Sequence, residues 1–295
     1  MIAASTPTLM AFAGRYCAGK IGLSPAYCLL LQATARKFTE FCGDDIQTQD
    51  LSADLVTRWC RYLLLAGIGR VTVAGKRRLL LTLWRSAATC SLAPPPGVLE
   101  QIRVLHHIPE AWTAAEIEAI VAGARRQPGM VGAIPAALWW PSLILAIYWT
   151  ATRIGALLRC RSTDCSLAGR WLLVGAGQQK NGRAQLHQLP DEAVAAIAAH
   201  YDPGRLLLWP WPFHPRTVWN RFRRIAEAAG VPCPRTHLNL FHRIRRTSLS
   251  YQWAADPGIA QRCAGHSSPA ILLASYVDPR IAVGRTAADV LPRIR

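Results

Sequence analysis

A long stretch without a charged residue, residues 127–152, constrains the fold of this chain more than any other feature. Its centre, WWPSLILAIYW, has the length and hydropathy of a membrane span, and such a segment has to be shielded from water. Two prolines, Pro135 and Pro141, and two glycines, Gly129 and Gly132, interrupt it before a full span is reached. We therefore predict a buried core helix that begins near Pro141, with a membrane helix as the alternative.

Three consecutive prolines in SLAPPPGVLE, residues 91–100, predict a domain boundary, because they cannot continue a helix. Before them, apolar residues at helical spacing predict a bundle of at least three helices. The helical segments are SPAYCLLLQATARKFTEFC, DLSADLVTRWCRYLLLAG and VTVAGKRRLLLTLWRSAATC. We place the first domain at residues 1–98, a linker at 99–110 and the second domain at 111–295.

The second domain is expected to combine helices with short strands. TAAEIEAIVAGARR begins with a capping box formed by Thr113 and Glu116, which indicates the start of a helix. WLLV at residues 171–174 and AQLHQL at 184–189 flank the turn-rich GAGQQKNGR, and this pattern predicts two strands joined by an exposed hairpin. From Asp191 the pattern returns to helix.

Charge and cysteine content narrow the class of partner. Lys and Arg number 34 against 17 Asp and Glu, a formal net charge of +17 spread along the whole chain. A polyanion such as nucleic acid is the expected partner, in preference to an acidic membrane surface. The nine cysteines form no CxxC pair and follow no secretory signal, which favours a reducing cytoplasm. We expect buried thiols; the alternative is a zinc site built from Cys233, His237, His242 and Cys263, whose spacings match no common finger.

Two segments of the second domain carry isolated basic residues. Arg153, in TATRIGALL, lies at the edge of an apolar stretch, where it either meets an anionic ligand or pairs with an internal carboxylate. Lys180, in QQKNGR, lies at the predicted hairpin tip and is one of only four lysines in an arginine-rich chain. Lysine can give up a proton and arginine cannot, so Lys180 is a candidate acid; the alternative is a solvated surface charge.

Two further segments add histidines, arginines and a tyrosine. In FHRIRRTSL, His242 and Arg245 are three residues apart and fall on one helix face. In AGHSSPAILLASYVD, His266 follows a glycine turn, and Tyr276 is predicted about three turns along a helix. A tyrosine alone on such a helix is more often a packing residue. With two arginines, two histidines and a lysine around it, the set fits a phosphoryl group undergoing transfer.

The order Arg…Lys…His-x-x-Arg…Gly-His…Tyr resembles the tyrosine recombinase (phage integrase) family, in a minimal two-domain Xer- or Cre-like layout. HRIRRT is similar to the family's HxLRRT motif, AGHSS to its LGHSS motif, and TVAGKRRLLLTLWRSA to a conserved helix of its core-binding domain. The resemblance implies a mainly α protein. A SAM-like helical core-binding domain would precede an α+β catalytic domain with a small three-stranded sheet.

The resemblance also implies a chemistry. Tyr276 would attack a DNA phosphate and form a 3′-phosphotyrosyl intermediate, with Arg153, Arg245 and His266 holding the phosphate. Lys180 would protonate the leaving 5′ oxygen, and His242 would act beside the tyrosine. The candidates for contacts with the DNA backbone are Lys76, Arg77, Arg78, Arg243 and Arg246.

The expected partners and location follow from the same resemblance. They are specific sites on double-stranded DNA and a homo-tetramer assembled on them, with helper recombinases or accessory proteins as open partners. No membrane, metal or cofactor is expected, and the expected location is the cytoplasm, at the nucleoid. The activity would serve integration, excision or transposition of a mobile element.

Two positions depart from the family's T-G-x-R-x-x-E motif. The glycine is Ala151 and the glutamate is Ala156, so another group has to orient Arg153. A type IB topoisomerase and a DNA-binding regulator with weak catalysis are therefore alternatives. The last segment, residues 283–295, is expected either to dock on a neighbouring subunit or to pack as a tail.

Overall fold

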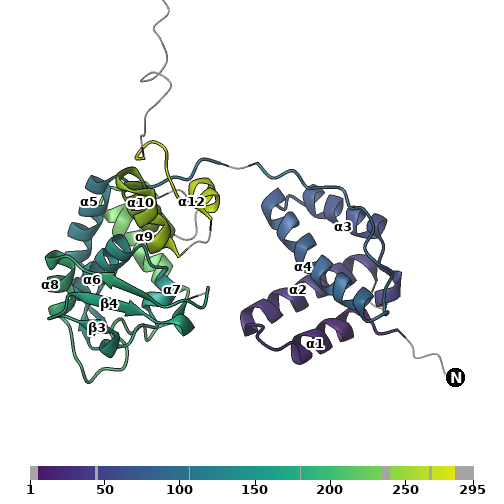
Figure 1. Ribbon diagram of the computed structural model, residues 1–295, viewed down its shortest axis with the longest axis horizontal. Helices are drawn as coiled ribbons and strands as arrows, with labels where there is room; N and C mark the ends of the chain where they lie inside the picture. The colour runs from purple at the N-terminus through teal and green to yellow at the C-terminus, as the bar shows by residue number, and fades with distance from the viewer. Residues whose placement is uncertain are drawn as a thin grey trace, which may run out of the picture. The chain divides into compact units, whose positions relative to one another are not determined.

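A computed structural model describes residues 6–43, 46–105, 107–179, 181–233, 240–265 and 268–282. The chain forms two compact units, Met1–His106 and His107–Arg295, called here the amino-terminal and carboxyl-terminal units (Figure 1). The division falls inside the segment predicted as a linker. Within the described ranges, no helix has both the length and the apolar character needed to cross a bilayer.

The amino-terminal unit is a helical bundle. Its elements are α1 (Leu9–Gly19), α2 (Pro25–Cys42), the 3-10 turn Thr48–Asp50, α3 (Ala53–Leu65) and α4 (Arg70–Thr89). The three predicted helices are α2, α3 and α4, and α1 was not predicted. Side-chain hydroxyls cap two of them, because Ser24 accepts from the Tyr27 N–H and Ser52 from the Leu55 N–H.

The core of this unit is built around aromatic side chains. Phe38 of α2 and Trp59 of α3 meet edge to face, with ring centroids 5.2 Å apart. Trp84 of α4 is buried in the same cluster and donates its indole N–H to the carbonyl of Pro94 at 2.7 Å. The proline segment, which follows the end of α4 at Thr89, is therefore tied back onto that helix.

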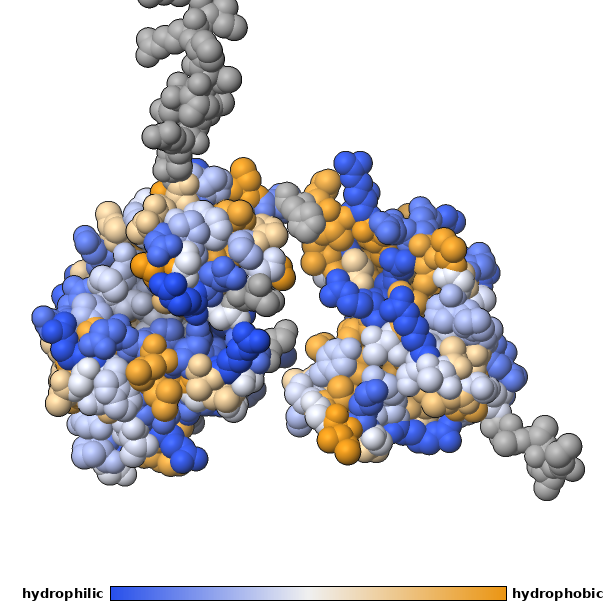
Figure 2. All heavy atoms as spheres, viewed as in Figure 1, coloured by the Kyte–Doolittle hydropathy of each residue, from blue (hydrophilic) through white to orange (hydrophobic). Residues whose placement is uncertain are grey.

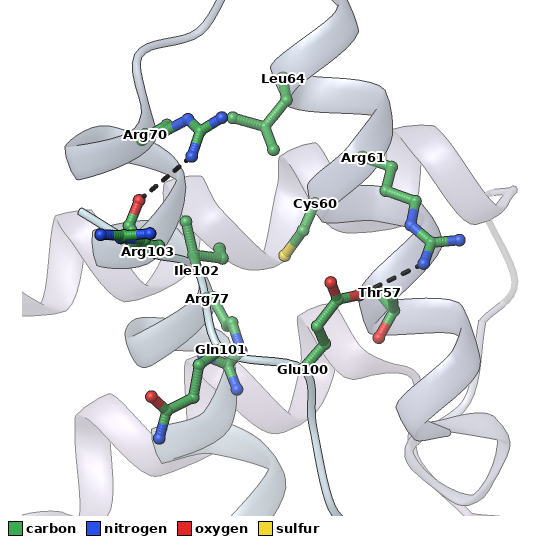
Figure 3. Close-up of a pocket in the computed structure, with 10 residues that line it drawn as sticks. All are labelled: Thr57, Cys60, Arg61, Leu64, Arg70, Arg77, Glu100, Gln101, Ile102 and Arg103. Carbon is green, nitrogen blue, oxygen red and sulfur yellow. Dashed lines mark hydrogen bonds and ion pairs between the residues drawn. The ribbon is translucent and has the colours of Figure 1, made fainter. Parts of the chain in front are cut away.

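The chain after the prolines is fixed on α3 and α4. Figure 3 shows residues 100–103 along one side of a cavity of about 270 Å³, with arginines of both helices around it. The contacts that anchor the segment are Arg77 to the carbonyl of Leu99 (3.3 Å), Arg61 to Glu100 (3.2 Å) and Arg70 to the carbonyl of Arg103 (3.4 Å). The first residues of the predicted linker thus belong to the surface of the amino-terminal unit.

The carboxyl-terminal unit is mainly helical, with two small sheets. Its helices are α5 (Ala114–Arg125), α6 (Ala136–Thr150), α7 (Ile154–Leu157), α8 (Asp191–Ala198), α9 (Thr217–Ala228), α10 (Phe241–Ala255), α11 (Pro257–Ala264) and α12 (Pro269–Ser275). Its strands are β1 (Met130–Val131), β2 (Ile134–Pro135), β3 (Cys165–Ser166), β4 (Trp171–Val174) and β5 (Gln185–Gln188). The predicted capping box at α5 is confirmed, because Thr113 and Glu116 accept each other's backbone N–H.

Helix α6 forms the centre of this unit, and its predicted start near Pro141 is wrong. The helix begins at Ala136, directly after Pro135, and Pro141 lies inside it. A proline at this position removes one intrahelical hydrogen bond. Burial of most of the helix, against α5, α8 and α10, outweighs that loss. The uncharged stretch is thus a core helix enclosed by the rest of the unit.

The described strands β3, β4 and β5 form an antiparallel three-stranded sheet with β4 in the middle (Figure 1). The predicted strand at 171–174 is confirmed as β4, and the predicted strand at 184–189 is β5, one residue shorter at each end. Leu172 pairs with His187 and Val174 with Gln185, so β5 brings two polar side chains into a fixed register. The short β1–β2 hairpin before α6 was not predicted.

The surface and the interior of each unit differ in polarity. Figure 2 shows hydrophilic side chains over much of the visible face of each unit, with apolar side chains in separate patches. Most of the buried apolar side chains lie in two large clusters, one for each unit. A smaller cluster in the carboxyl-terminal unit joins α10, α11 and α12 and contains Leu249, Leu272 and Val277.

Candidate active site

Three of the predicted catalytic residues meet at one cavity of the carboxyl-terminal unit. Arg153, His242 and Arg245 all line a space of about 230 Å³, with Trp219 of α9 and Gln178 of the hairpin also lining it. The two α10 residues lie on one helix face, as their spacing predicted. The sequence thus correctly grouped two distant segments, residues 152–156 and α10, around a common space.

Arg245 is held in place by backbone carbonyls. Its side chain is 2% exposed and donates to the carbonyl of Ala151 and, at 2.8 Å, to the carbonyl of Ala264 at the end of α11. Burial and the charge of Arg153 lower the pKa of Arg245 to about 10, and the Tyr276 side chain acts in the opposite direction. The guanidinium therefore stays protonated at neutral pH and joins α10, α11 and the loop after α6.

Arg153 faces the cavity without an ion-pair partner in the described part of the chain. It precedes α7 and is half-buried, and none of its side-chain nitrogens hydrogen-bonds another described residue. Ala156, where a glutamate was expected, is buried on α7. The charge of Arg153 helps to lower the pKa of Arg245, a second guanidinium that lines the same cavity. Two such cations on one cavity form a site for an anion.

The loop that carries Arg153 keeps an unusual backbone. Ala151 has φ of 50° and ψ of 20°, the left-handed conformation in which glycine is favoured. This geometry turns the chain at the end of α6, and the Ala151 carbonyl accepts from Arg245. The turn is therefore kept at this position, although alanine replaces the glycine of the family motif.

His242 is a neutral imidazole in this setting. Burial, followed by the charges of Arg245, Arg246 and Arg153, lowers its pKa to about 4. Its ring centroid lies 6.3 Å from that of Tyr276. A neutral imidazole beside a phenol can accept a proton, which a charged one could not.

Tyr276 reaches the same group of residues, although its predicted place on a helix is wrong. Helix α12 ends at Ser275, and Tyr276 is the residue after it. The Arg245 guanidinium carbon lies 5.0 Å from the centroid of the tyrosine ring. The phenol and the buried arginine are therefore direct neighbours.

Two predicted catalytic residues, Lys180 and His266, lie outside the described residues. Their chain neighbours are described: the Asn181 side-chain amide donates to the carbonyl of Gly265 at 3.0 Å. Next to this contact, the Gln185 amide donates to the carbonyl of Arg262 at 2.6 Å. The hairpin between β4 and β5 is thus bonded to the end of α11.

The predicted DNA-contact residues differ in their surroundings. Arg78 on α4 is exposed, Lys76 is half-buried, and Arg77 is bonded to the carbonyl of Leu99. Arg243 is 6% exposed and forms an ion pair with Glu110, which does not favour the predicted contact with DNA. Its role is to fix the segment before α5 onto α10.

Arg246, the remaining DNA-contact candidate, also bonds within the protein. Its Nε donates to the carbonyl of Ser275 at 3.2 Å, and its Nη1 donates to the carbonyl of Glu110 at 3.5 Å. The side chain is half-buried, and burial and the charge of Arg243 lower its pKa. Arg246 therefore reaches the residue directly before Tyr276.

Sequence reasoning missed three residues of this site. His187 on β5 is buried, its Nε2 lies 3.4 Å from Thr152 Oγ1, and burial and the charge of Arg245 lower its pKa to about 4. Trp219 lines the cavity, and Gln185 bonds the hairpin to α11. For His187, its inward-facing position on a short amphipathic strand was a signal in the sequence. Trp219 and Gln185 gave no such signal.

The zinc alternative gains no support from the structure. Among the described residues, no group of three or more His, Cys, Asp or Glu side chains could hold a metal ion. His237, one of the four residues proposed for that site, lies outside the described residues.

The fold is similar to that of solved integrases. A segment of the Tn1549 transposon integrase in complex with circular intermediate DNA matches with a TM-score of 0.70 at 13% identity, covering 96% of this chain and 98% of that one. A lambda integrase dimer bound to a COC′ core site matches with a TM-score of 0.67 at 18% identity, covering 90% and 97%. No family model and no curated protein sequence matches the chain. The predicted mainly α fold with a small three-stranded sheet is confirmed, and it is shared with these integrases.

Proposed function

We propose that this protein is a site-specific tyrosine recombinase that cuts and rejoins DNA strands through a 3′-phosphotyrosyl intermediate. The observation that carries the proposal is the meeting of a phenol, two guanidiniums and a neutral imidazole from distant segments. Tyr276 lies against Arg245, and Arg245, Arg153 and His242 line one cavity. The fold shared with the Tn1549 and lambda integrases supports the same conclusion.

In the proposed reaction, the oxygen of Tyr276 attacks the scissile phosphorus and the bond to the 5′ oxygen breaks. Arg153 and Arg245 bind the non-bridging oxygens, whose charge rises in the transition state. The phenol proton passes to a base, for which the neutral His242 is suited. Lys180 supplies a proton to the departing 5′ oxygen, and His266 donates a hydrogen bond to the phosphate.

The second half of the reaction reverses the first. A 5′-hydroxyl from a partner strand attacks the phosphotyrosine, and the phenol leaves. Because the phosphodiester energy is kept in the covalent intermediate, the exchange requires no nucleotide hydrolysis. No metal ion takes part in the proposed chemistry, in which the side chains alone supply the positive charge and the protons.

The proposed setting is a tetramer on two DNA sites of a mobile element, which is integrated, excised or transposed. A solved complex supports the analogy, because it is a lambda integrase tetramer bound to a Holliday junction. That structure matches this chain with a TM-score of 0.67 at 18% identity, covering 90% of this chain and 79% of that one. Exchange between two duplexes needs four active sites, whereas a type IB topoisomerase acts alone on one duplex.

The test uses DNA from the ends of the element that encodes this chain, in duplexes nicked near the candidate site. A nick lets the cut fragment diffuse away, so the covalent protein–DNA complex accumulates. We expect wild-type protein to form this complex and to recombine two such sites. Relaxation of supercoiled DNA at scattered positions without recombination would instead favour the topoisomerase.

A DNA-binding regulator is the second candidate function, and one observation favours it. Arg153 has no carboxylate partner among the described residues, and the expected glutamate is Ala156. A loosely oriented arginine would lower the rate of phosphoryl transfer. Specific binding without any covalent complex, on DNA from both ends, would support the regulator and contradict the proposed recombinase.

A further inference from the structure

A buried carboxylate lies two residues after Tyr276, at Asp278. Only 1% of its surface is exposed, so its charge has to be satisfied inside the protein. Its oxygens accept from the backbone N–H of Ala111 at 2.9 Å and from Arg280, whose Nε and Nη2 lie at 2.9 and 2.6 Å. The Asp278 N–H donates to Ser250 Oγ at 2.8 Å.

These contacts connect three segments of the carboxyl-terminal unit. Ala111 belongs to the leading segment, residues 107–113, which precedes α5; Ser250 belongs to α10, and Asp278 belongs to the turn after α12. Ser250 Oγ in turn donates to the carbonyl of Arg246 at 2.7 Å. The Asp278 carboxylate therefore fixes the turn to the start of the unit, and the Asp278 backbone N–H fixes it to the helix that carries Arg245 and His242.

The chain on the other side of Tyr276 is bound to the same helix. Arg246 of α10 donates to the carbonyl of Ser275, one residue before the tyrosine. Tyr276 is thus held between two anchors, at 275 and 278, that both lead to α10. Helix α12 contributes little to the positioning of Tyr276. It is only seven residues long, and among its described residues Leu272 alone is buried.

We propose that Asp278 is a positioning residue for Tyr276. Its carboxylate bonds the turn after α12 to the leading segment, and its backbone N–H bonds the same turn to α10; together these contacts set the place of the phenol relative to Arg245. The inference rests on the proposed function, in which Tyr276 is the nucleophile. Displacement of a reacting group by about 1 Å can cost on the order of 100-fold in rate.

The variants separate this role from general stabilisation. Asp278→Asn keeps an oxygen for the Ala111 N–H and loses the charge that binds Arg280, and Asp278→Ala loses both. Glu116→Gln is the matched control. It makes the same carboxylate-to-amide change at the capping box of α5, where Glu116 accepts from the Thr113 N–H at 2.7 Å.

The first measurement is the single-turnover rate of covalent complex formation at saturating nicked DNA, together with the Kd for that DNA and the melting temperature. We expect Asp278→Asn to lower the rate about 10- to 100-fold, with Kd unchanged within about twofold, and Asp278→Ala to lower it further. Glu116→Gln should lower the melting temperature and leave the rate within about twofold of wild type.

The second measurement does not depend on activity. The protein is labelled with 3-fluorotyrosine, and the ¹⁹F resonance of Tyr276 is assigned by its loss in Tyr276→Phe. We expect this resonance to shift or broaden in Asp278→Asn and to stay in place in Glu116→Gln. A wild-type protein that forms no covalent complex would contradict the proposed function, while the resonance would still test the anchoring.

Two results would overturn the inference. One is an Asp278→Asn protein whose Tyr276 resonance is that of wild type. The other is a covalent-complex rate that depends only on the melting temperature of each variant. In that case Glu116→Gln would lose as much rate as Asp278→Asn when the two are equally destabilised.

Discussion

At the scale of single residues, the balance of charge around Arg245 determines what the cavity can bind. Arg245 is buried and bonded to two neutral carbonyls, and Arg153 has no carboxylate partner among the described residues. Within the described part of the chain, no carboxylate neutralises either guanidinium. A tetrahedral anion with several oxygens would satisfy both, and a phosphodiester is such a group.

Arg245→Lys tests this interpretation of the cavity. A lysine cannot span the carbonyls of Ala151 and Ala264 while presenting a planar pair of N–H groups to a phosphate. We expect the rate of covalent complex formation on nicked DNA to fall about 10²- to 10³-fold. The matched control is Arg243→Lys, on the same helix and also buried but paired with Glu110. A control that loses as much rate as Arg245→Lys would contradict the role assigned to Arg245.

The sequence predicted which distant segments meet at the site, while the roles of their residues stay predictions. Arg153, His242, Arg245 and Tyr276 were named from motif order, and the structure brings all four together. The supports of those residues were not predictable. Asp278 and Gln185 act through contacts with segments far away in the chain, and such contacts leave no local pattern in a sequence.

At the scale of elements, the hairpin between β4 and β5 depends on α11. The Gln185 side-chain amide donates to the carbonyls of Arg262 and Cys263, at 2.6 and 3.3 Å, at the end of α11. The Asn181 amide does the same at Gly265. The hairpin that carries Lys180 is therefore bonded to the turn that precedes His266.

Gln185→Leu should release this contact. We expect faster amide hydrogen exchange in residues 175–184 and a covalent-complex rate lowered about tenfold, since a less ordered hairpin presents its residues less often in the reactive geometry. Gln188→Leu is the control on the same strand, because Gln188 is exposed and its amide lies 3.4 Å from the Gly169 carbonyl, away from α11. Equal exchange rates in the two variants would show that Gln185 does not order the hairpin.

Element boundaries were predicted well where local chemistry sets them and poorly where burial does. The capping box of Thr113 and Glu116 marked the start of α5 correctly. Pro141 misled the prediction for α6, because burial of most of that helix compensates for a missing hydrogen bond. Tyr276 was placed on a helix that ends one residue earlier, at a turn held by tertiary contacts of Asp278.

At the scale of the whole molecule, the two units should respond differently to acid. Residues 1–105 contain no histidine, whereas the carboxyl-terminal unit holds three with strongly lowered pKa values, His187, His200 and His242. Burial is the main cause that lowers the pKa of each to about 4. Between pH 6.5 and 4 the unfolded chain binds these protons and the folded unit does not, so its stability falls as the pH falls.

Calorimetry at several pH values checks this prediction. We expect the transition of the carboxyl-terminal unit to move to lower temperature below pH 6.5. Its free energy of unfolding should fall by on the order of 1.4 kcal/mol per pH unit for each histidine. His200→Asn should weaken that dependence by about one proton. A carboxyl-terminal unit whose stability does not change between pH 6.5 and 4.5 would contradict the assignment of neutral buried histidines.

The net charge of +17 predicts a steep dependence of DNA binding on salt, with a slope of about −0.9 for each phosphate neutralised. Two arginines allow contacts with DNA to be distinguished from contacts within the protein. Arg78 is exposed on α4, and Arg243 is buried against Glu110. Arg78→Gln should reduce the slope by about one, and Arg243→Gln should lower stability and leave the slope unchanged. A slope that changes with Arg243→Gln and not with Arg78→Gln would reverse these roles.

The central claim is that the phenol of Tyr276 becomes bonded to DNA phosphorus. Its most direct test is to digest the protein after reaction with nicked DNA and to locate the nucleotide-bearing peptide by mass spectrometry. The account predicts a 3′-nucleotide on the peptide that contains Tyr276, and no adduct in Tyr276→Phe. An adduct on another residue, or one that persists in Tyr276→Phe, would contradict it.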